Sequence, residues 1–169
     1  MLETNQRIAA NYGRMVAGNS PYALREYPAW EMVRLYLRRV PRGSEESHSD
    51  GWSLRWSHAG ESVNWEGAIE RPFIARKDSP IWPALGDGAG GYKDTLGNPF
   101  PPFAFNSGLA WREVSRVECV NLGLMQEDEA SEPMEGNFIP DKKKMRKLLD
   151  ELGPEFEAAV TKDLEALFA

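Results

Sequence analysis

Residues 78 to 108 most restrict how this chain can fold, because proline and glycine recur there at short intervals. Four glycines fall within the six residues GDGAGG, at 86 to 91, and the segment GNPFPPFAFNSG follows shortly afterwards. Proline lacks an amide hydrogen and disrupts helix interiors, whereas glycine takes turn conformations that other residues avoid. This part of the chain must therefore form short elements and loops.

Aromatic side chains are the means by which such a loop-rich chain can be held together. The 169 residues include six tryptophans and seven phenylalanines. A buried tryptophan removes on the order of 200 Å² from water, which stabilises the fold by roughly a few kcal/mol. Phe100, Phe103 and Phe105 project from the proline-rich stretch, which is stable only when these rings are buried against other groups. The sequence therefore predicts an aromatic core.

The rest of the pattern predicts short helices and strands. Apolar residues at helical spacing indicate a helix over 3 to 17. Pro28 favours a helical turn, and the alternation of apolar and polar residues after it predicts a strand. Another short helix carries Trp52 and Trp56 on one face, and Ser115 starts a further one with the capping sequence Ser-Arg-Val-Glu. The predicted fold class is α+β, irregular and loop-rich, with an aromatic core and two C-terminal helices.

The chain divides into three parts by composition. Residues 1 to 125 are expected to form a Trp-, Pro- and Gly-rich globular domain, followed by an exposed acidic linker at 126 to 139. Residues 140 to 169 carry apolar residues at helical spacing on both sides of a Gly-Pro pair, which predicts a C-terminal appendage of two amphipathic helices. Their apolar stripes include Leu149 and Leu164 and would close over the domain or grip another subunit.

Charge and composition exclude several classes of protein. Hydrophobic residues make up 41% of the chain and charged residues 27%, which is typical of one globular domain. The net charge of −6 disfavours nucleic acid as a general ligand. No apolar run is long enough for a membrane span, and the N-terminus lacks a signal-peptide core, so we expect cytoplasmic synthesis and no membrane partner.

The residues that usually carry chemistry are few and scattered. The two histidines, His48 and His58, are not at metal-ligand spacing with each other or with the single cysteine, Cys119. A helix N-terminus could lower the pKa of Cys119, but no partner base is evident, so a buried structural cysteine is favoured. The GDGAGG run lacks the residues that follow the glycines of a phosphate-binding loop. We therefore predict no catalytic residue, no metal site and no cofactor, hence a protein that is not an enzyme.

Contacts with other proteins are the expected mode of action. The arginines around residue 38 and the lysines around residue 143 form two basic patches, which would meet DNA or an acidic partner surface, or remain solvated. Aromatic and apolar anchors dominate the energetics of most interfaces. The candidate partner-binding residues are Arg34, Arg38, Arg39, Trp82, Phe100, Phe103, Phe105, Leu149 and Leu164.

The stretch from 77 to 124, with PAWEMVRLYLRRVPRG and WSLRW upstream, resembles a known group of proteins. It is similar to bacterial and prophage proteins associated with phage head morphogenesis, in particular the Mu-type minor head proteins. The residues that carry the resemblance are Pro101, Pro102, Phe103, Ser107, Gly108, Arg112, Glu113 and Val114. The Cys-Arg-Cys element common in Mu-type minor head proteins is missing here.

This resemblance implies a non-catalytic structural or head-assembly protein, present in the virion near the portal. Its partners would be other virion or portal subunits, or further copies of itself in a homo-oligomer. Two alternatives stay open. One is a small enzyme or ligand-binding domain that uses residues 86 to 108 as a lid over a pocket lined by Trp82, Tyr92 and Phe100. The other is an acidic inhibitor or immunity-type protein that binds a basic enzyme.

Overall fold

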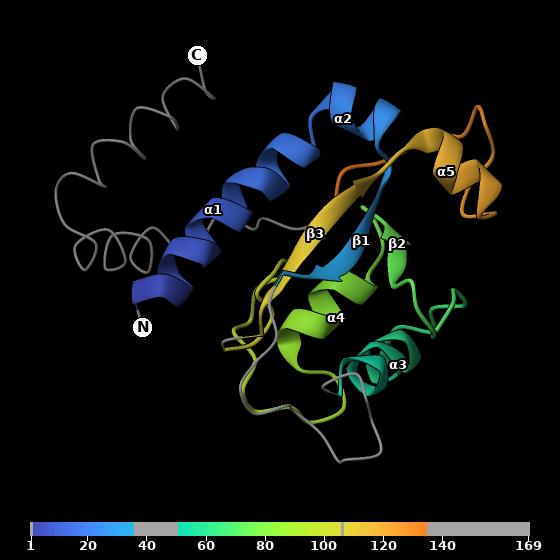
Figure 1. The fold of residues 1–169 in the computed structure, drawn as a ribbon. Helices are drawn as coiled ribbons and strands as arrows, with labels where there is room; N and C mark the ends of the chain where they lie inside the picture. Colours follow the sequence, from blue (N-terminus) through green and yellow to red (C-terminus); the bar gives the residue numbers. More distant parts are fainter. Residues whose placement is uncertain (1, 36–50, 106, 135–169) are drawn as a thin grey trace, which may run out of the picture.

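The computed structural model describes residues 2–35, 51–105 and 107–134 (Figure 1). Within these ranges, short helices and a three-stranded antiparallel sheet confirm the predicted α+β class. The two predicted C-terminal helices, with Leu149 and Leu164, lie outside the described residues.

Five helices are present in the described part of the chain. They are α1 (Leu2–Gly18), α2 (Pro21–Glu26), α3 (Trp52–Ser62), α4 (Ile81–Asp87) and α5 (Arg116–Asn121). The predicted helix over 3 to 17 is thus confirmed as α1, whose Met15 is buried with Ile8 and Tyr12 packed beside it. Ser20 caps α2, because its Oγ accepts a hydrogen bond from the backbone N–H of Ala23.

The sheet has the strand order β2-β1-β3, so β1 lies in the centre. Its strands are β1 (Ala29–Arg34), β2 (Ile74–Arg76) and β3 (Leu109–Val114). Trp30 lies opposite Ala75 on one side and opposite Glu113 on the other. β2 spans only three residues, so it pairs with the first half of β1 and leaves the second half to β3.

The predicted helical turn after Pro28 is wrong, because β1 begins directly at Ala29. Proline at this place is compatible with a helix start, but it is equally compatible with the extended chain before a strand. Pairing with β3, some eighty residues later in the sequence, decides the outcome. Such distant pairing leaves no local signal.

The two faces of the sheet carry separate apolar clusters, because successive residues of a strand point to opposite sides. Trp30 and Met32 belong to the larger cluster, which also takes side chains from α1, α3 and α4. Ala29 belongs to a smaller cluster with Val114 and Cys119, on the side where α5 packs. The predicted aromatic core is the larger of the two.

Proline and glycine shape the elements next to this core. Pro83 lies inside α4, yet the helix continues to Asp87. The reason is that Pro83 is only the third residue of α4, where a backbone N–H would have no partner within the helix. Ser115 begins α5 as predicted, since its Oγ accepts from the N–H of Glu118 at 3.2 Å, and Gly123 follows with a φ of +70°.

The first part of the predicted acidic linker contacts the domain. Arg116 donates to the backbone carbonyls of Glu127 and Glu129, and Arg76 forms an ion pair with the carboxylate of Glu129. Met134 is buried, and its N–H donates to the side chain of Asn19 at 2.9 Å. Most side chains of 126–133 are exposed, but two arginines and the buried Met134 hold this segment against the domain.

Candidate functional site

The aromatic residues predicted to bind partners are mostly part of the core. Trp82, Phe100 and Phe103 are each at most 3% exposed. The ring of Trp82 contacts four others, which are those of Trp30, Trp56, Phe103 and Trp111. The assignment of Trp82, Phe100 and Phe103 to a partner surface is therefore wrong, because their rings are enclosed by the chain itself.

The other predicted contact residues have different positions. Phe105 is 44% exposed, and Arg34 is half-buried at the end of β1, where its Nη1 donates to the carbonyl of Ser107. Arg38 and Arg39 lie outside the described residues, as do Leu149 and Leu164. Of the predicted set, Phe105 is thus the most accessible aromatic side chain.

The 86–108 segment is joined to the core. The N–H of Gly97 donates to the carbonyl of Gly86, and the N–H of Leu96 to that of Phe103. Gly86 lies so close to the Asn98 backbone that a Cβ there would be 1.9 Å from the Asn98 carbonyl oxygen. The proposed pocket between Trp82, Tyr92 and Phe100 is not formed, because Trp82 and Phe100 are packed against other rings.

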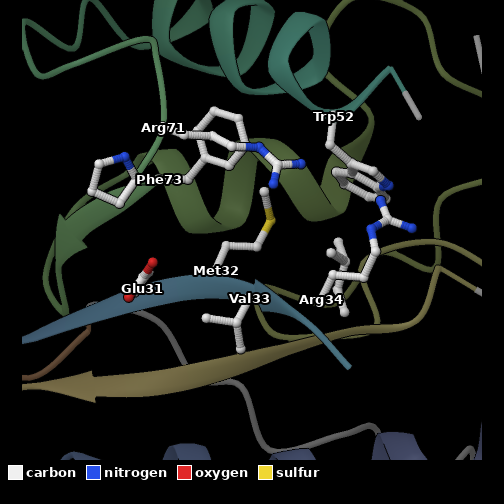
Figure 2. A pocket seen from close by; sticks show the side chains of 9 residues that line it. Glu31, Met32, Val33, Arg34, Trp52, Arg71 and Phe73 are labelled. Atoms are coloured by element: carbon white, nitrogen blue, oxygen red, sulfur yellow. The ribbon is translucent and has the colours of Figure 1, made fainter. Parts of the chain in front are cut away.

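A different pocket lies beside the second half of β1 (Figure 2). It has a volume of about 410 Å³ and is half open to solvent. It lies beyond the start of β2, where Phe73 still accepts a hydrogen bond from the Met32 N–H at 2.9 Å and Pro72 and Arg71 continue along the pocket edge. The lining residues are Glu31, Met32, Val33, Arg34, Trp52, Arg71, Pro72, Phe73 and Leu109.

The wall of this pocket combines buried apolar groups with hydrogen-bond donors. Met32, Phe73 and Leu109 are all at most 6% exposed. The guanidinium of Arg71 lies over the Phe73 ring, 5.5 Å from its centroid. Figure 2 shows that the Arg71 side chain crosses the pocket above Met32. Glu31 is the acidic group in the lining, and its carboxylate already accepts from Arg112 Nε at 2.6 Å.

The indole nitrogen of Trp52 differs from most other buried indole nitrogens in the described part of the chain. Trp30 donates to Glu113, and Trp56 and Trp82 donate to backbone carbonyls. Trp52 is 1% exposed and its Nε1 has no acceptor among the described residues; the same holds for Trp111. Only the first of these two lines the pocket. A buried donor without an acceptor costs about 1–3 kcal/mol. The Trp52 nitrogen has almost no solvent-accessible surface, so it does not face the open space of the pocket.

A buried lysine forms a second polar centre. The side chain of Lys77 is fully buried, and its Nζ lies 2.8 Å from both Glu113 Oε2 and the carbonyl oxygen of Gly18. Burial lowers the pKa of Lys77, and the bond to Glu113 opposes this shift. The ammonium lies 5.0 Å from the centroid of the Trp30 ring. This centre connects the last turn of α1 to the sheet, where a cation also meets the negative end of the helix dipole.

A third cluster joins α3 to the glycine-rich loop. Arg55 lies between the rings of Trp52 and Tyr92, and its Nη2 contacts Asp94 Oδ1 at 2.8 Å. His58 Nδ1 is 3.1 Å from the hydroxyl oxygen of Tyr92. Any Cβ at Gly90 would lie 2.5 Å from that ring nitrogen, so the loop approaches α3 as closely as glycine allows. His58 therefore has a packing role, and His48 lies outside the described residues.

Cys119 is buried in the smaller cluster, as the structural interpretation expected. Burial raises its pKa to about 11, so the thiol stays protonated at neutral pH. In the part of the chain that the structure describes, no three His, Cys, Asp or Glu residues are grouped to hold a metal ion. Among the helices of 2–35, 51–105 and 107–134, none is long and apolar enough to cross a bilayer.

The helices α2 and α5 lie on the same side of the molecule (Figure 1), and several apolar side chains on and next to them are exposed. Val117 is 71% exposed and Leu122 is 49% exposed; on the α2 side, Tyr22 is 64% exposed and Tyr27 is 39% exposed. Arg116 Nε donates to the carbonyl of Arg25 at 2.7 Å and thereby fixes α5 beside the end of α2. We call these four exposed residues the α2–α5 surface.

Of the pocket residues, only Arg34 was among the predicted contact residues, and the α2–α5 surface was not predicted. Trp52 was singled out only for its helical spacing with Trp56, and Arg71 was not singled out at all. The sequence did contain one signal. Arg71 directly precedes Pro72 and Phe73, which places a charged side chain at the entrance to a strand. Comparisons with protein-family models, curated proteins and solved structures find no match to this chain.

Proposed function

We propose that this protein is a non-catalytic structural or head-assembly protein of a phage or prophage, which acts through contacts with virion or portal subunits. The resemblance of residues 77 to 124 to minor head proteins gives the class of partner. The observation that carries the proposal is the α2–α5 surface, where apolar side chains are exposed on a rigid support.

Rigidity at this surface comes from a network around Arg116. This side chain bonds the carbonyls of Arg25, Glu127 and Glu129, so it joins α5 to α2 and to the 126–134 segment. Exposed apolar groups in a fixed arrangement are a common feature of protein-binding surfaces, because little conformational entropy is lost on association. The tryptophans pack against one another in the core and so stabilise the domain that carries this surface.

The substitution Val117→Glu tests the proposal. Val117 is the second residue of α5, where a carboxylate interacts favourably with the helix dipole, so the fold should tolerate the change. We expect the wild-type protein to form a complex with the portal protein encoded in the same phage or prophage, and Val117→Glu to weaken it at least about tenfold. Size-exclusion chromatography with light scattering measures the complex, and mass spectrometry of purified particles measures incorporation.

Leu54→Glu is the matched control, because Leu54 is 55% exposed but belongs to α3, away from the α2–α5 surface. This variant should bind like the wild type. Absence of the wild-type protein from purified particles, together with no complex with portal or other head proteins, would refute the proposal. Equal loss of binding in both variants would show that the α2–α5 surface is not the binding site.

A further inference from the structure

We infer that residues 126–134 form an exchangeable strap, and that the two arginines holding it bind the same segment of a second copy of this chain. The inference does not depend on the proposed role in head assembly, because it concerns only contacts between residues of this protein. It starts from Arg76 and Arg116, each of which bonds both to the domain and to the strap.

The domain holds both arginines in place without the help of the strap. The carboxylate of Asp78 accepts from Arg76 Nε at 3.1 Å and from Arg76 Nη2 at 2.8 Å. The carbonyl of Arg25 accepts from Arg116 Nε at 2.7 Å. The Nη1 groups of the two arginines therefore keep their positions when the strap leaves. They form a site that is already arranged for an acidic peptide, which lowers the entropic cost of binding one.

The strap itself shows which peptide this site binds. Arg76 Nη1 forms an ion pair with the carboxylate of Glu129. Arg116 Nη1 donates to two backbone carbonyls of the strap, at 3.1 and 2.8 Å. At the far end, the side chain of Asn19 accepts from the N–H of Met134 at 2.9 Å, and the Met134 side chain is buried in the larger cluster. The ligand is thus a segment with one carboxylate, free backbone carbonyls and an apolar residue further along.

The strap is held by few contacts, and these contacts are open to water. Most side chains of 126–133 are exposed. Glu129 is 39% exposed, so solvent competes for its ion pair. Gln126 is also exposed, and it directly follows Met125, which is buried in the smaller cluster. A change of backbone angles at Gln126 would therefore release the strap and leave the domain intact, and segments of this kind open at a low cost in free energy.

A second copy of the chain carries the matching segment. When two copies exchange straps, Arg76 and Arg116 of each copy regain the same partners, and only the hinge at Gln126 adopts a new conformation. Exchange of an identical element is a route to dimers that costs little, because the contacts are the same in both states. The exchange is reciprocal, so it ends at two copies.

A charge swap between two full-length variants tests this inference. Arg76→Glu and Glu129→Arg should each be monomeric alone, because like charges keep the strap away from the site. Mixed in equal amounts, they should form a heterodimer of twice the 19.0 kDa chain mass, because each strap then meets an opposite charge on the other copy. Size-exclusion chromatography with light scattering measures the mass. A variant that unfolds alone should regain its near-UV circular dichroism on mixing, so the outcome can be read in either case.

Arg76→Glu mixed with Glu132→Arg is the matched control. Glu132 is an exposed strap residue, and the described contacts of Arg76 and Arg116 do not include it. Glu132→Arg should therefore keep its own strap in place. This mixture should stay monomeric.

Hydrogen exchange gives a second measurement that needs no charge reversal. Glu129→Gln keeps the shape of the side chain but removes its charge, and we expect the Met134 amide to exchange roughly threefold faster or more. Glu132→Gln should leave that rate unchanged. The inference is overturned if the charge-swapped mixture forms no heterodimer, if the control mixture dimerises equally, or if Glu129→Gln leaves the Met134 amide at the wild-type rate.

Discussion

Phe103 and Phe105 are separated by one residue on the same proline-rich stretch, yet they have opposite environments. Phe103 is fully buried and its ring contacts those of Trp52, Trp82 and Trp111. Phe105 is 44% exposed. A regular extended chain would place side chains two residues apart on the same side. The chain instead turns at Phe105, so this ring leaves the side on which Phe103 is buried.

Alanine substitution at these two positions should therefore have unequal effects on stability. Phe103→Ala removes a ring from the centre of the core, and we expect it to lower the free energy of unfolding by about 3–5 kcal/mol. Phe105→Ala should change it by less than about 1 kcal/mol. Urea denaturation followed by tryptophan fluorescence measures both. Similar losses for the two variants would show that Phe105 is also a core residue.

At the scale of elements, the contact between α1 and the sheet depends on Lys77. Its ammonium reaches the carbonyl of Gly18 at the C-terminal end of α1 and the carboxylate of Glu113 on β3. Glu113 also accepts from the indole of Trp30 on β1. One buried cation thus connects a helix to all three strands, since Lys77 itself directly follows β2.

Lys77→Met should loosen α1 selectively. The methionine keeps the apolar stem but removes the donor to Gly18, so we expect a loss of about 1–3 kcal/mol and faster amide hydrogen exchange in the last turn of α1. Glu113 is 42% exposed, so its unpaired charge remains hydrated. Arg112→Gln is the control, because it breaks ion pairs of a 45% exposed arginine and should cost at most about 1 kcal/mol. Equal exchange rates in α1 for both variants would contradict this role.

The elements that could be predicted from the sequence are those that local signals determine. α1 follows from apolar spacing, and α5 follows from the Ser115 cap and Gly123. The start of β1 could not be predicted, because its partner strand is about eighty residues away. The pocket is hidden for the same reason: its lining residues come from α3, from β1 and β3, and from the chain before β2, which only folding brings together.

For the molecule as a whole, the sequence could show that the aromatic residues matter but not which of them are enclosed. In the sequence, an aromatic residue of the core cannot be distinguished from one that binds a partner. Only the folded structure shows which rings are exposed. Trp82 and Phe100 therefore appeared as interface residues although they are buried. Val117 and Leu122 did not stand out, because isolated aliphatic residues in a short helix are ordinary.

Global stability should depend on pH through Cys119. Its pKa rises from 9.0 to about 11 in the fold, so the folded state favours the neutral thiol. The stabilising effect of the neutral thiol is complete below pH 9 and is lost as the pH rises toward 11. Its loss lowers the free energy of unfolding by roughly 2–3 kcal/mol. Denaturation between pH 8 and 11 should show a steeper decline for the wild type than for Cys119→Ala. Parallel curves would mean that the thiol ionises equally in the folded and unfolded protein.

Both edges of the described sheet are poor templates for another strand. β2 has three residues and follows Pro72, and β3 carries Arg112 and Glu113 in its middle. Short, proline-flanked or charged edges oppose the addition of strands from neighbouring molecules. Copies of this protein at high local concentration should accordingly resist growth into fibres by strand addition.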